Sequence, residues 1–361
     1  MRICFIANGA SIHTQRWVNS LSDIGHEVIL VSPNTTPAGA IKVANVIDDF
    51  YPKFNRISCY LGCLSRINSV VHRLKPDILH AHYASGYGFL GRRCNYHPFL
   101  ISVWGSDIFD FPKKSILHQH LLTANLNCAD YVASTSHVMA QETHKYLKNK
   151  EIHITPFGVN TNYFKSSSPL NQSSDGDLVM GSIKSLEPIY GMTKLVQAFI
   201  SLSARYSKLR LLIIGSGSQY DLLNSMIQQA ELSNRATILS SVPHDLVPQY
   251  LSQIDIFVVP SYQESFGVAA LEASSCTVPV IASDVGGLPE VVVNESTGFL
   301  VDPDDVNALI QKLTVLIQQP ALRREFGLRG RQFVCENYEW HDCVVNMSNL
   351  YDRICHTAST L

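Results

Sequence analysis

Short apolar runs alternate with longer stretches of helical pattern along most of this chain, and this alternation restricts the fold more than any other feature. The runs in the first half include RICFIAN, EVILVSP, DILHAHY, FLISVWG, YVASTS and EIHITPF, and those in the second half include LVMGSI, LRLLIIG, IDIFVVPS, PVIAS and GFLV. Strands that alternate with helices predict βαβ units and parallel sheets, so the predicted fold class is α/β.

A polar stretch from Ser166 to Asp177, SSSPLNQSSDGD, interrupts the alternation and is typical of a linker between domains. We therefore expect two doubly wound, Rossmann-like domains, at residues 1–165 and 166–339. The pattern after Asp302 is mainly helical, and we expect a C-terminal helix at residues 340–361 to pack back onto the first domain. A length of 361 residues with 46% hydrophobic content suffices for two cores.

The two halves of the chain differ in charge, although the net charge is only −2. Residues 1–165 carry 16 Lys and Arg against 10 Asp and Glu, a balance of +6, and the remainder carries 12 against 20, a balance of −8. A basic domain favours an anionic partner such as a membrane surface or a phosphorylated lipid, but uneven solvation of two surfaces explains these counts equally well. We expect no nucleic-acid partner.

The sequence predicts a cytoplasmic protein. The N-terminus MRICFIANGA turns polar too early for a signal peptide, and no stretch approaches the ~18 apolar residues that a spanning helix requires. The nine cysteines form no CxxC pair and show no zinc-ligand spacing. We therefore expect reduced thiols, no bound metal, and only peripheral contact with a membrane.

The loops that follow the strands are the places to look for a ligand, because open α/β sheets bind ligands beyond the carboxyl ends of their strands. The first such loop is NGAS, where Gly9 permits close approach to the backbone, and a later one is GSGS, with Gly215 and Gly217. Neither matches G-x-G-x-x-G, because Tyr220 stands where the third glycine belongs. A dinucleotide site is therefore weakly supported.

The segment ESFGVAALEAS places two carboxylates, Glu264 and Glu272, in otherwise apolar surroundings after the strand IDIFVVP. An unpaired buried carboxylate is costly, so each one needs a partner. A helix that begins near Gly267 would offer free N–H groups to a phosphate or diphosphate. Because like charges repel, the glutamates suit the neutral hydroxyls of a ribose and a hexose on either side of that diphosphate.

This segment resembles the signature of glycosyltransferase family 4, the retaining enzymes with the GT-B fold. The resemblance rests on E-S-F-G-x4-E-A with the following CTVPVIAS and GGLPE, and on GHEVILVSP, PDILHAHY, ITPFGVNTNYF and DIFVVPS, so it covers most of the chain. It implies two Rossmann-like domains that face an interdomain cleft, with Glu264 contacting the transferred sugar and Glu272 the ribose. The donor-binding candidates between these two glutamates are Ser265, Phe266, Gly267 and Val268.

The diphosphate clamp departs from the family pattern. In GSIKSLEPIYG, Lys184 suits the first cation that the family places on the donor diphosphate. Tyr190 or Ile189 stands where a second cation is expected. The sequence therefore offers only one of the two cations that the resemblance implies at this site.

A second departure lies in FLISVWGSDIF, where Trp104 replaces a histidine that many family members carry. An indole packs on a sugar face and donates one hydrogen bond, but it accepts no proton. Asp107 becomes a catalytic candidate, although a turn or helix-cap role explains it equally well. Acceptor-side candidates are His13, His82 and Trp104. His80 and His82 lie at the end of one predicted strand, and we expect them to point to opposite faces, one toward the cleft and the other toward the core.

The resemblance implies a hexosyltransferase that moves a sugar from a nucleotide-diphosphate sugar to a hydroxyl, with retention and without a cofactor or metal. The leaving group gathers negative charge, so positioned N–H groups and a cation should carry much of the catalysis. The catalytic candidates are Glu264, Lys184 and Asp107. Two alternatives stay open: a nucleotide-sugar 2-epimerase on the same fold, and a catalytically silent sugar-nucleotide-binding protein.

The acceptor is expected on the basic first domain. Its basic pairs at residues 92–93 and 113–114 suit a glycan or a polyprenyl-diphosphate-linked glycan at the inner membrane face, as in bacterial surface polysaccharide synthesis. The segment KKSILHQHLL would then lie peripherally against anionic lipid.

Overall fold

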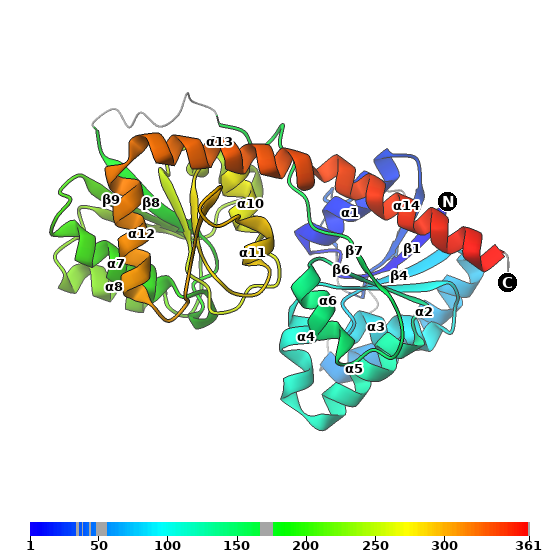
Figure 1. Ribbon diagram of the computed structural model, residues 1–361. Coiled ribbons are helices and arrows are strands. Elements are labelled where there is room, and N and C mark those ends of the chain that lie inside the picture. Colours follow the sequence, from blue (N-terminus) through cyan, green and yellow to red (C-terminus); the bar gives the residue numbers. More distant parts are fainter. Residues whose placement is uncertain (34–35, 38, 43–44, 48–55, 167–175, 360–361) are drawn as a thin grey trace. The chain divides into compact units, whose positions relative to one another are not determined.

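The computed structural model describes residues 1–361 except 34–35, 38, 43–44, 48–55, 167–175 and 360–361 (Figure 1). Most of the predicted linker between Ser166 and Asp177 therefore lies outside the described residues. The chain divides into two compact units, which we call unit 1 and unit 2. Unit 1 comprises Met1–Pro156 and His341–Leu361, and unit 2 comprises Phe157–Trp340.

Unit 1 contains a seven-stranded sheet in the order β3-β2-β1-β4-β5-β6-β7, whose neighbouring strands run parallel. The order reverses between β1 and β4, as in a doubly wound sheet. Its strands are β1 (Arg2–Ile6), β2 (Glu27–Val31), β3 (Asn45–Ile47), β4 (Ile78–His82), β5 (Phe99–Val103), β6 (Tyr131–Ser134) and β7 (Ile152–Ile154).

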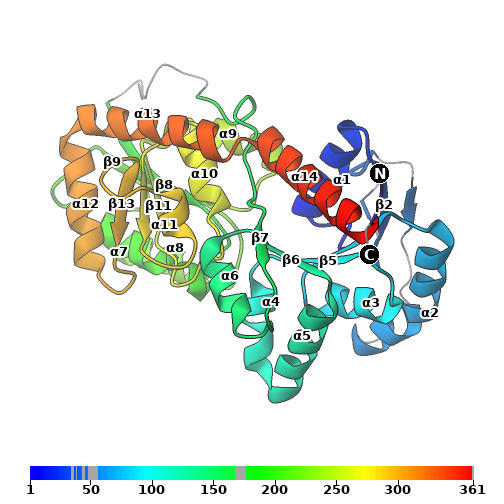
Figure 2. The same cartoon turned by 45° about the vertical axis from the view of Figure 1, so that its right-hand side comes forward.

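Helices cover both faces of this sheet (Figures 1 and 2). Helices α2, α3 and α5 pack together on one face, and α1 and α14 lie on the other. The helices are α1 (Ile12–Asp23), α2 (Arg56–Leu74), α3 (Gly86–Cys94), α4 (Ser106–Phe109), η1 (Phe111–Lys114), α5 (Ile116–Cys128), α6 (His137–His144) and α14 (Trp340–Ser359). The central strands β4 and β5 are buried along their whole length, as a sheet covered on both faces requires.

Unit 2 repeats this architecture with six strands in the order β10-β9-β8-β11-β12-β13, again with parallel neighbours. Here the order reverses between β8 and β11. The strands are β8 (Leu178–Ile183), β9 (Leu209–Ile214), β10 (Ala236–Leu239), β11 (Ile256–Val259), β12 (Val280–Ser283) and β13 (Gly298–Val301). The predicted pair of parallel α/β domains is thus confirmed.

The helices of unit 2 also form two layers. Helix α7 packs on α8 and α12, whereas α10 packs on α13 and on strands β11 and β12. They are η2 (Pro188–Tyr190), α7 (Met192–Ser203), α8 (Tyr220–Gln229), η3 (His244–Leu246), α9 (Val247–Leu251), α10 (Val268–Ser275), α11 (Leu288–Val291), α12 (Val306–Gln318) and α13 (Pro320–Asn337). Each unit has its own apolar core.

The first boundary between the units lies earlier in the chain than the predicted one at residue 165. Residues 157–165 belong to unit 2 because their polar groups bond there. The Ser275 hydroxyl donates to the carbonyl of Phe164 at 2.6 Å, and the Tyr163 hydroxyl donates to the carbonyl of Asp245. None of the helices in the described ranges combines the length and hydropathy that a bilayer crossing requires.

Candidate functional site

The strongest candidate site lies where the strand order of unit 2 reverses. Lys184 follows β8 and Glu264 follows β11, and these neighbouring strands end at the same edge of the sheet. The Lys184 ammonium donates to the Glu264 carboxylate at 2.6 Å, with 18% and 10% of the two side chains exposed. Two catalytic candidates that are 80 residues apart therefore meet at the place where doubly wound sheets bind ligands.

The loops at this edge pack backbone against backbone, and glycines make this possible. A Cβ on Gly215 would lie 1.9 Å from the carbonyl oxygen of Lys184, and one on Gly286 would lie 1.8 Å from that of Glu264. Gly286 also has a φ of +54°, in the left-handed region. Real Cβ atoms do not approach oxygen so closely, so the positions of Lys184 and Glu264 depend on these two glycines.

Gly217 fixes the GSGS loop in a similar way. Its Cα faces the backbone of Leu186, with 2.6 Å from a built Cβ to the Leu186 carbonyl oxygen. The next residue, Ser218, donates its N–H and its hydroxyl to Glu187, at 3.0 and 2.6 Å. The two hydrogen bonds lower the pKa of the Glu187 carboxyl. The GSGS loop is thus tied to the loop that carries Lys184.

Helix α10 begins at the same edge. Gly267 is its N-cap with a φ of 111°, no side chain caps the first turn, and Val268 is the first helical residue. Ser265 and Phe266 precede it; the Phe266 ring is buried and packs edge-on against Phe157 and Tyr338. The first N–H groups of α10 are therefore available to an anion.

Glu272 is 8% exposed on α10, and its partner is His244. The His244 Nε2 lies 2.8 Å from the Glu272 Oε1, and its ring packs on Phe164 with centroids 5.3 Å apart. The sequence analysis predicted that Glu272 has a partner but did not identify His244. Its position directly after the loop that follows β10 was the available signal.

Two cations at this edge lie over tyrosine rings. The Lys184 ammonium is 4.5 Å from the ring centroid of Tyr190, and the Lys194 ammonium is 3.6 Å from that of Tyr262. Lys194, which the sequence analysis did not single out, is 5% exposed and donates to the carbonyl of Pro303. Burial lowers the pKa of Lys194, and the charges of the nearby Asp304 and Asp302 oppose that shift.

The acceptor-side candidates gather at the corresponding place in unit 1, where β1 and β4 are neighbours. The Trp104 ring lies 4.2 Å from that of His82 and 6.0 Å from that of His13. Gly9, a predicted donor-binding residue, is in the loop after β1, and its N–H donates to the Ser32 hydroxyl at 3.0 Å. The other donor-binding candidates lie in unit 2.

His80 and His82 correct one expectation. They do not point to opposite sides, because residues two apart on a strand share a face. Their ring centroids are 4.7 Å apart, and both rings pack on Phe5 at 4.9 Å. His80 is held by the Tyr351 hydroxyl of α14 at 2.8 Å and by the Ser102 hydroxyl at 2.7 Å. Burial lowers the pKa of His80 to about 3 and that of His82 well below its ordinary value.

Asp107 is 1% exposed and acts on the backbone around it. Its carboxylate accepts N–H groups from Ala84 at 2.8 Å, from Trp104 at 3.2 Å and from Gly105 at 2.9 Å. Burial raises the pKa of Asp107, while these hydrogen bonds lower it. The contacts give Asp107 a structural role in holding the Trp104 loop, and its catalytic role stays a prediction.

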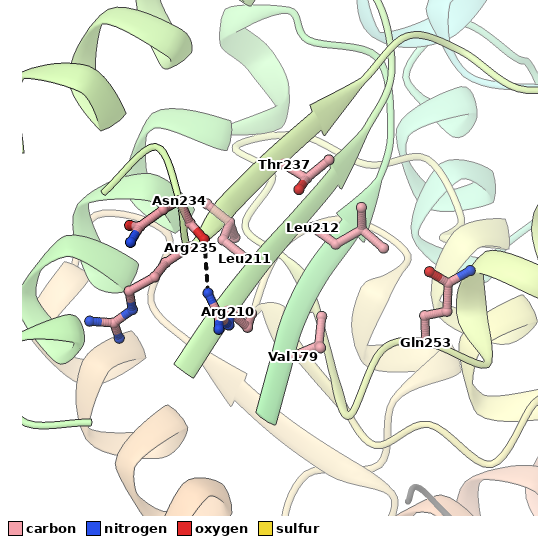
Figure 3. Close-up of a pocket in the computed structure, with 8 residues that line it drawn as sticks. All are labelled: Val179, Arg210, Leu211, Leu212, Asn234, Arg235, Thr237 and Gln253. Atoms are coloured by element: carbon pink, nitrogen blue, oxygen red, sulfur yellow. Dashed lines mark hydrogen bonds between the residues drawn. The ribbon is translucent and has the colours of Figure 1, made fainter. Parts of the chain in front are cut away.

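A separate pocket of about 290 Å³ lies at the opposite, amino-terminal ends of the strands of unit 2 (Figure 3). Two arginines line it. Arg210 is bound to Asp177 and to the carbonyl of Asn234. The guanidinium of Arg235 donates to the carbonyls of Ser203, Tyr206 and Leu209. Because these arginines already bond within the unit, the pocket is a poor candidate for an anionic ligand. In the described ranges, no three His, Cys, Asp or Glu side chains are grouped to hold a metal ion.

Both units match known protein families. Residues 2–136 match the family described as "Glycosyl transferase 4-like", and residues 165–333 match "Glycosyl transferases group 1". The N-acetyl-alpha-D-glucosaminyl L-malate synthase of Bacillus anthracis is 27% identical over 83% of this chain and 80% of its own. The phosphatidylinositol N-acetylglucosaminyltransferase GPI3 subunit of Saccharomyces cerevisiae is 25% identical over 97% and 81%.

Solved structures share the fold of the whole chain. A sucrose-phosphate synthase from Thermosynechococcus elongatus superposes with a TM-score of 0.84 at 21% identity, over 99% of this chain and 100% of its own. The HepE protein of Anabaena, solved in complex with UDP, gives 0.80 at 17% identity over all of both chains. The identity of both is low, so these likenesses bear on the fold alone.

Proposed function

Because this chain belongs to glycosyltransferase family 4 and is itself a glycosyltransferase, we propose that it transfers a hexose from a nucleotide-diphosphate sugar to a glycan or lipid-linked glycan, with retention at the anomeric carbon. The observation that carries this proposal is the meeting of Lys184 and Glu264 at the strand-order reversal of unit 2. A cation, a carboxylate and a helix N-terminus at one edge suit the parts of such a donor.

Each part of the donor has a matching group. The diphosphate suits the Lys184 ammonium and the first N–H groups of α10, because both stabilise negative charge on the leaving group. The sugar hydroxyls suit Glu264, and the ribose hydroxyls suit Glu272. HepE, which has the same fold, was solved with UDP and with UDP-glucose, so this fold can hold such a donor.

The proposed reaction needs no covalent intermediate. The acceptor hydroxyl forms a bond to the anomeric carbon on the same face from which the diphosphate departs. The bond between that carbon and the diphosphate oxygen breaks, and the released diphosphate takes the hydroxyl proton. Neither a metal nor a cofactor enters these steps. Lys184 then contributes by holding the leaving group as its charge grows.

We place the acceptor on unit 1, around Trp104, His13 and His82. The names of relatives support a lipid-linked acceptor: one is a phosphatidylinositol N-acetylglucosaminyltransferase subunit, and another is a GDP-mannose-dependent phosphatidylinositol monomannoside mannosyltransferase. A polyprenyl-diphosphate-linked glycan has the same combination of lipid, anion and sugar. This acceptor would place the protein in the cytoplasm at the inner membrane face, in bacterial surface polysaccharide synthesis.

The start of α5 is the proposed point of membrane contact. Ile116 and Leu117 are 73% and 77% exposed, and the exposed Lys113 and Lys114 precede them, with only Ser115 between. Adjacent lysines and large apolar side chains suit an anionic bilayer surface. Vesicles with and without an anionic lipid test this contact by flotation. Equal flotation of the wild type and of Ile116→Ser/Leu117→Ser would rule out this membrane contact.

The function is tested first by donor binding. In a thermal-shift panel of UDP-, GDP- and ADP-sugars, a ligand at 100 times its Kd should stabilise the protein by about 2.7 kcal/mol. The second test is transfer of labelled sugar to a membrane extract. Donor turnover without an acceptor would instead support a 2-epimerase, and donor binding without any transfer would support a silent binding protein.

A further inference from the structure

A buried carboxylate and a fixed imidazole form a second pair in unit 2. Glu272 is 8% exposed, and its neighbours along α10, Leu271 and Ala273, are fully buried. An ionised carboxylate only accepts hydrogen bonds, so His244 donates from its Nε2 to the Glu272 Oε1 at 2.8 Å. That N–H is what allows a charge in this apolar helix.

The His244 ring is fixed through Phe164, a residue that is itself bound to helix α10. The His244 ring packs on Phe164, which is 3% exposed. The carbonyl of Phe164 accepts the hydroxyl of Ser275 at the end of α10, and it also accepts Arg331 of α13 at 3.1 Å. Phe164, His244 and Glu272 therefore form a closed set of contacts anchored on α10. Such a set fixes the direction of the carboxylate before any ligand arrives.

His244 uses one of the two carboxylate oxygens. Oε1 takes its N–H, and among the described residues Oε2 carries no hydrogen bond. The His244 side chain is 37% exposed, so the pair lies at the surface of the unit rather than inside the core. The second oxygen is thus oriented but available to a hydroxyl.

We propose that His244 is a positioning residue that fixes Glu272 for the hydroxyls of the donor ribose. The inference rests on the proposed function, because it requires a nucleotide at this edge of unit 2. It adds that the protein tells a ribonucleotide from its 2′-deoxy counterpart through His244, which does not itself touch the ribose. His244 acts through the carboxylate and has no part in the chemical step.

The test compares ribo- and 2′-deoxynucleotides by isothermal titration calorimetry. The probe is whichever of UDP, GDP and ADP the wild type binds most tightly, together with its 2′-deoxy form. A hydrogen bond to a charged group is worth roughly tenfold or more in affinity, so the wild type should prefer the ribonucleotide by about that factor. His244→Phe keeps the ring packing and removes the N–H donor, so it should lose most of that preference.

Matched variants separate positioning from general damage. His244→Gln still offers an N–H to Glu272 and should keep the preference, whereas Asp245→Asn, at an exposed neighbour, should change nothing. In a Glu272→Gln background, adding His244→Phe should have no further effect on discrimination. Melting curves check the fold, and His244→Asn, whose amide is too short to reach the carboxylate, replaces His244→Phe if that variant is unstable.

The outcomes distinguish this inference from the proposed function. A wild type that binds no nucleoside diphosphate would overturn the proposed function. A wild type that binds one but does not distinguish ribose from deoxyribose would overturn only the inference. The inference is also wrong if His244→Phe discriminates as well as the wild type does.

Discussion

Replacing Lys184 by methionine should destabilise unit 2, because it leaves a carboxylate without its cation. The Lys184 and Glu264 side chains are only 18% and 10% exposed, and the atoms they join are 2.6 Å apart. Removing one partner of a fully buried pair costs roughly 3–5 kcal/mol. Because water still reaches both groups, we expect a loss of about 1–3 kcal/mol. For a domain of this size that lowers the melting temperature by roughly 2–12 °C.

The sign of a double mutant tests the reasoning. Glu264→Gln replaces the carboxylate by a neutral group of the same shape, so Lys184→Met/Glu264→Gln should melt above Lys184→Met alone. Differential scanning calorimetry without ligand measures the stability, and donor turnover measures the function. Turnover of Lys184→Met should fall by a factor on the order of 10²–10³, as when one preorganised donor is removed elsewhere. A double mutant that melts at or below the single mutant would refute the ion-pair argument.

Four shorter predictions follow from the contacts. Tyr190→Ala removes the ring under the Lys184 ammonium. Because a cation–π contact is worth roughly 0.5–2 kcal/mol, donor affinity measured by calorimetry should drop several-fold. Tyr190→Phe keeps the ring and should bind the donor like the wild type. Asp107→Asn turns one acceptor of backbone N–H groups into a donor and should cost about 1–3 kcal/mol, so an unchanged melting temperature would contradict the role of this carboxylate. The pKa of His80 is lowered to about 3 in the fold from an ordinary 6.5, so the stability from its neutral form is complete above pH 6.5 and is lost as the pH falls from there toward 3. The loss is up to about 1.4 kcal/mol per pH unit, and His80→Gln should flatten this acid slope in melting curves taken from pH 7 to 4. Glu264→Gln should bind the nucleoside diphosphate at least as tightly as the wild type but lose the added affinity for the nucleotide sugar, and a proportional loss of both would argue against separate roles for Lys184 and Glu264.

Periodicity predicted the long and buried elements of the fold and the edge strands β7 and β13, but it missed the edge strand at the other end of each sheet. The central strands β4, β5 and β11 are mostly apolar and buried at every position, as expected for parallel strands covered on both faces. The edge strands β3 and β10, with three and four residues, were not predicted. None of the four residues of β10, ATIL, is fully buried, and an apolar run this short does not stand out from its surroundings. Edge strands that bury one side weakly are hard to recognise from pattern alone.

The site residues divide in a similar way. Some belong to one sequence motif, and others come from distant parts of the chain. Glu264, Gly267 and Glu272 belong to one contiguous segment, and the segment marks them. His244 and Lys194 reach the site from η3 and α7. His244 is marked only by its place after the loop that follows β10, and Lys194 carries no signal beyond its residue type. Contacts between residues far apart in the sequence depend on the strand order and the loop positions. The sequence pattern predicted the α/β class but not these details. The need for a partner to Glu272 was deducible, but the identity of that partner was not.

Glu264 and Glu272 are both poorly solvated carboxylates, and each is stabilised by a hydrogen-bond donor. The two donors differ in mobility. The partner of Glu264 is an ammonium on a flexible stem, which also lies over the Tyr190 ring. A diphosphate carries more negative charge than one carboxylate, so we infer that an arriving donor draws the Lys184 ammonium toward itself and leaves Glu264 open to sugar hydroxyls. The partner of Glu272 is a planar ring wedged against Phe164, which no ligand needs to move. A movable cation suits the group whose charge changes during transfer, and a fixed donor suits the ribose, which does not react.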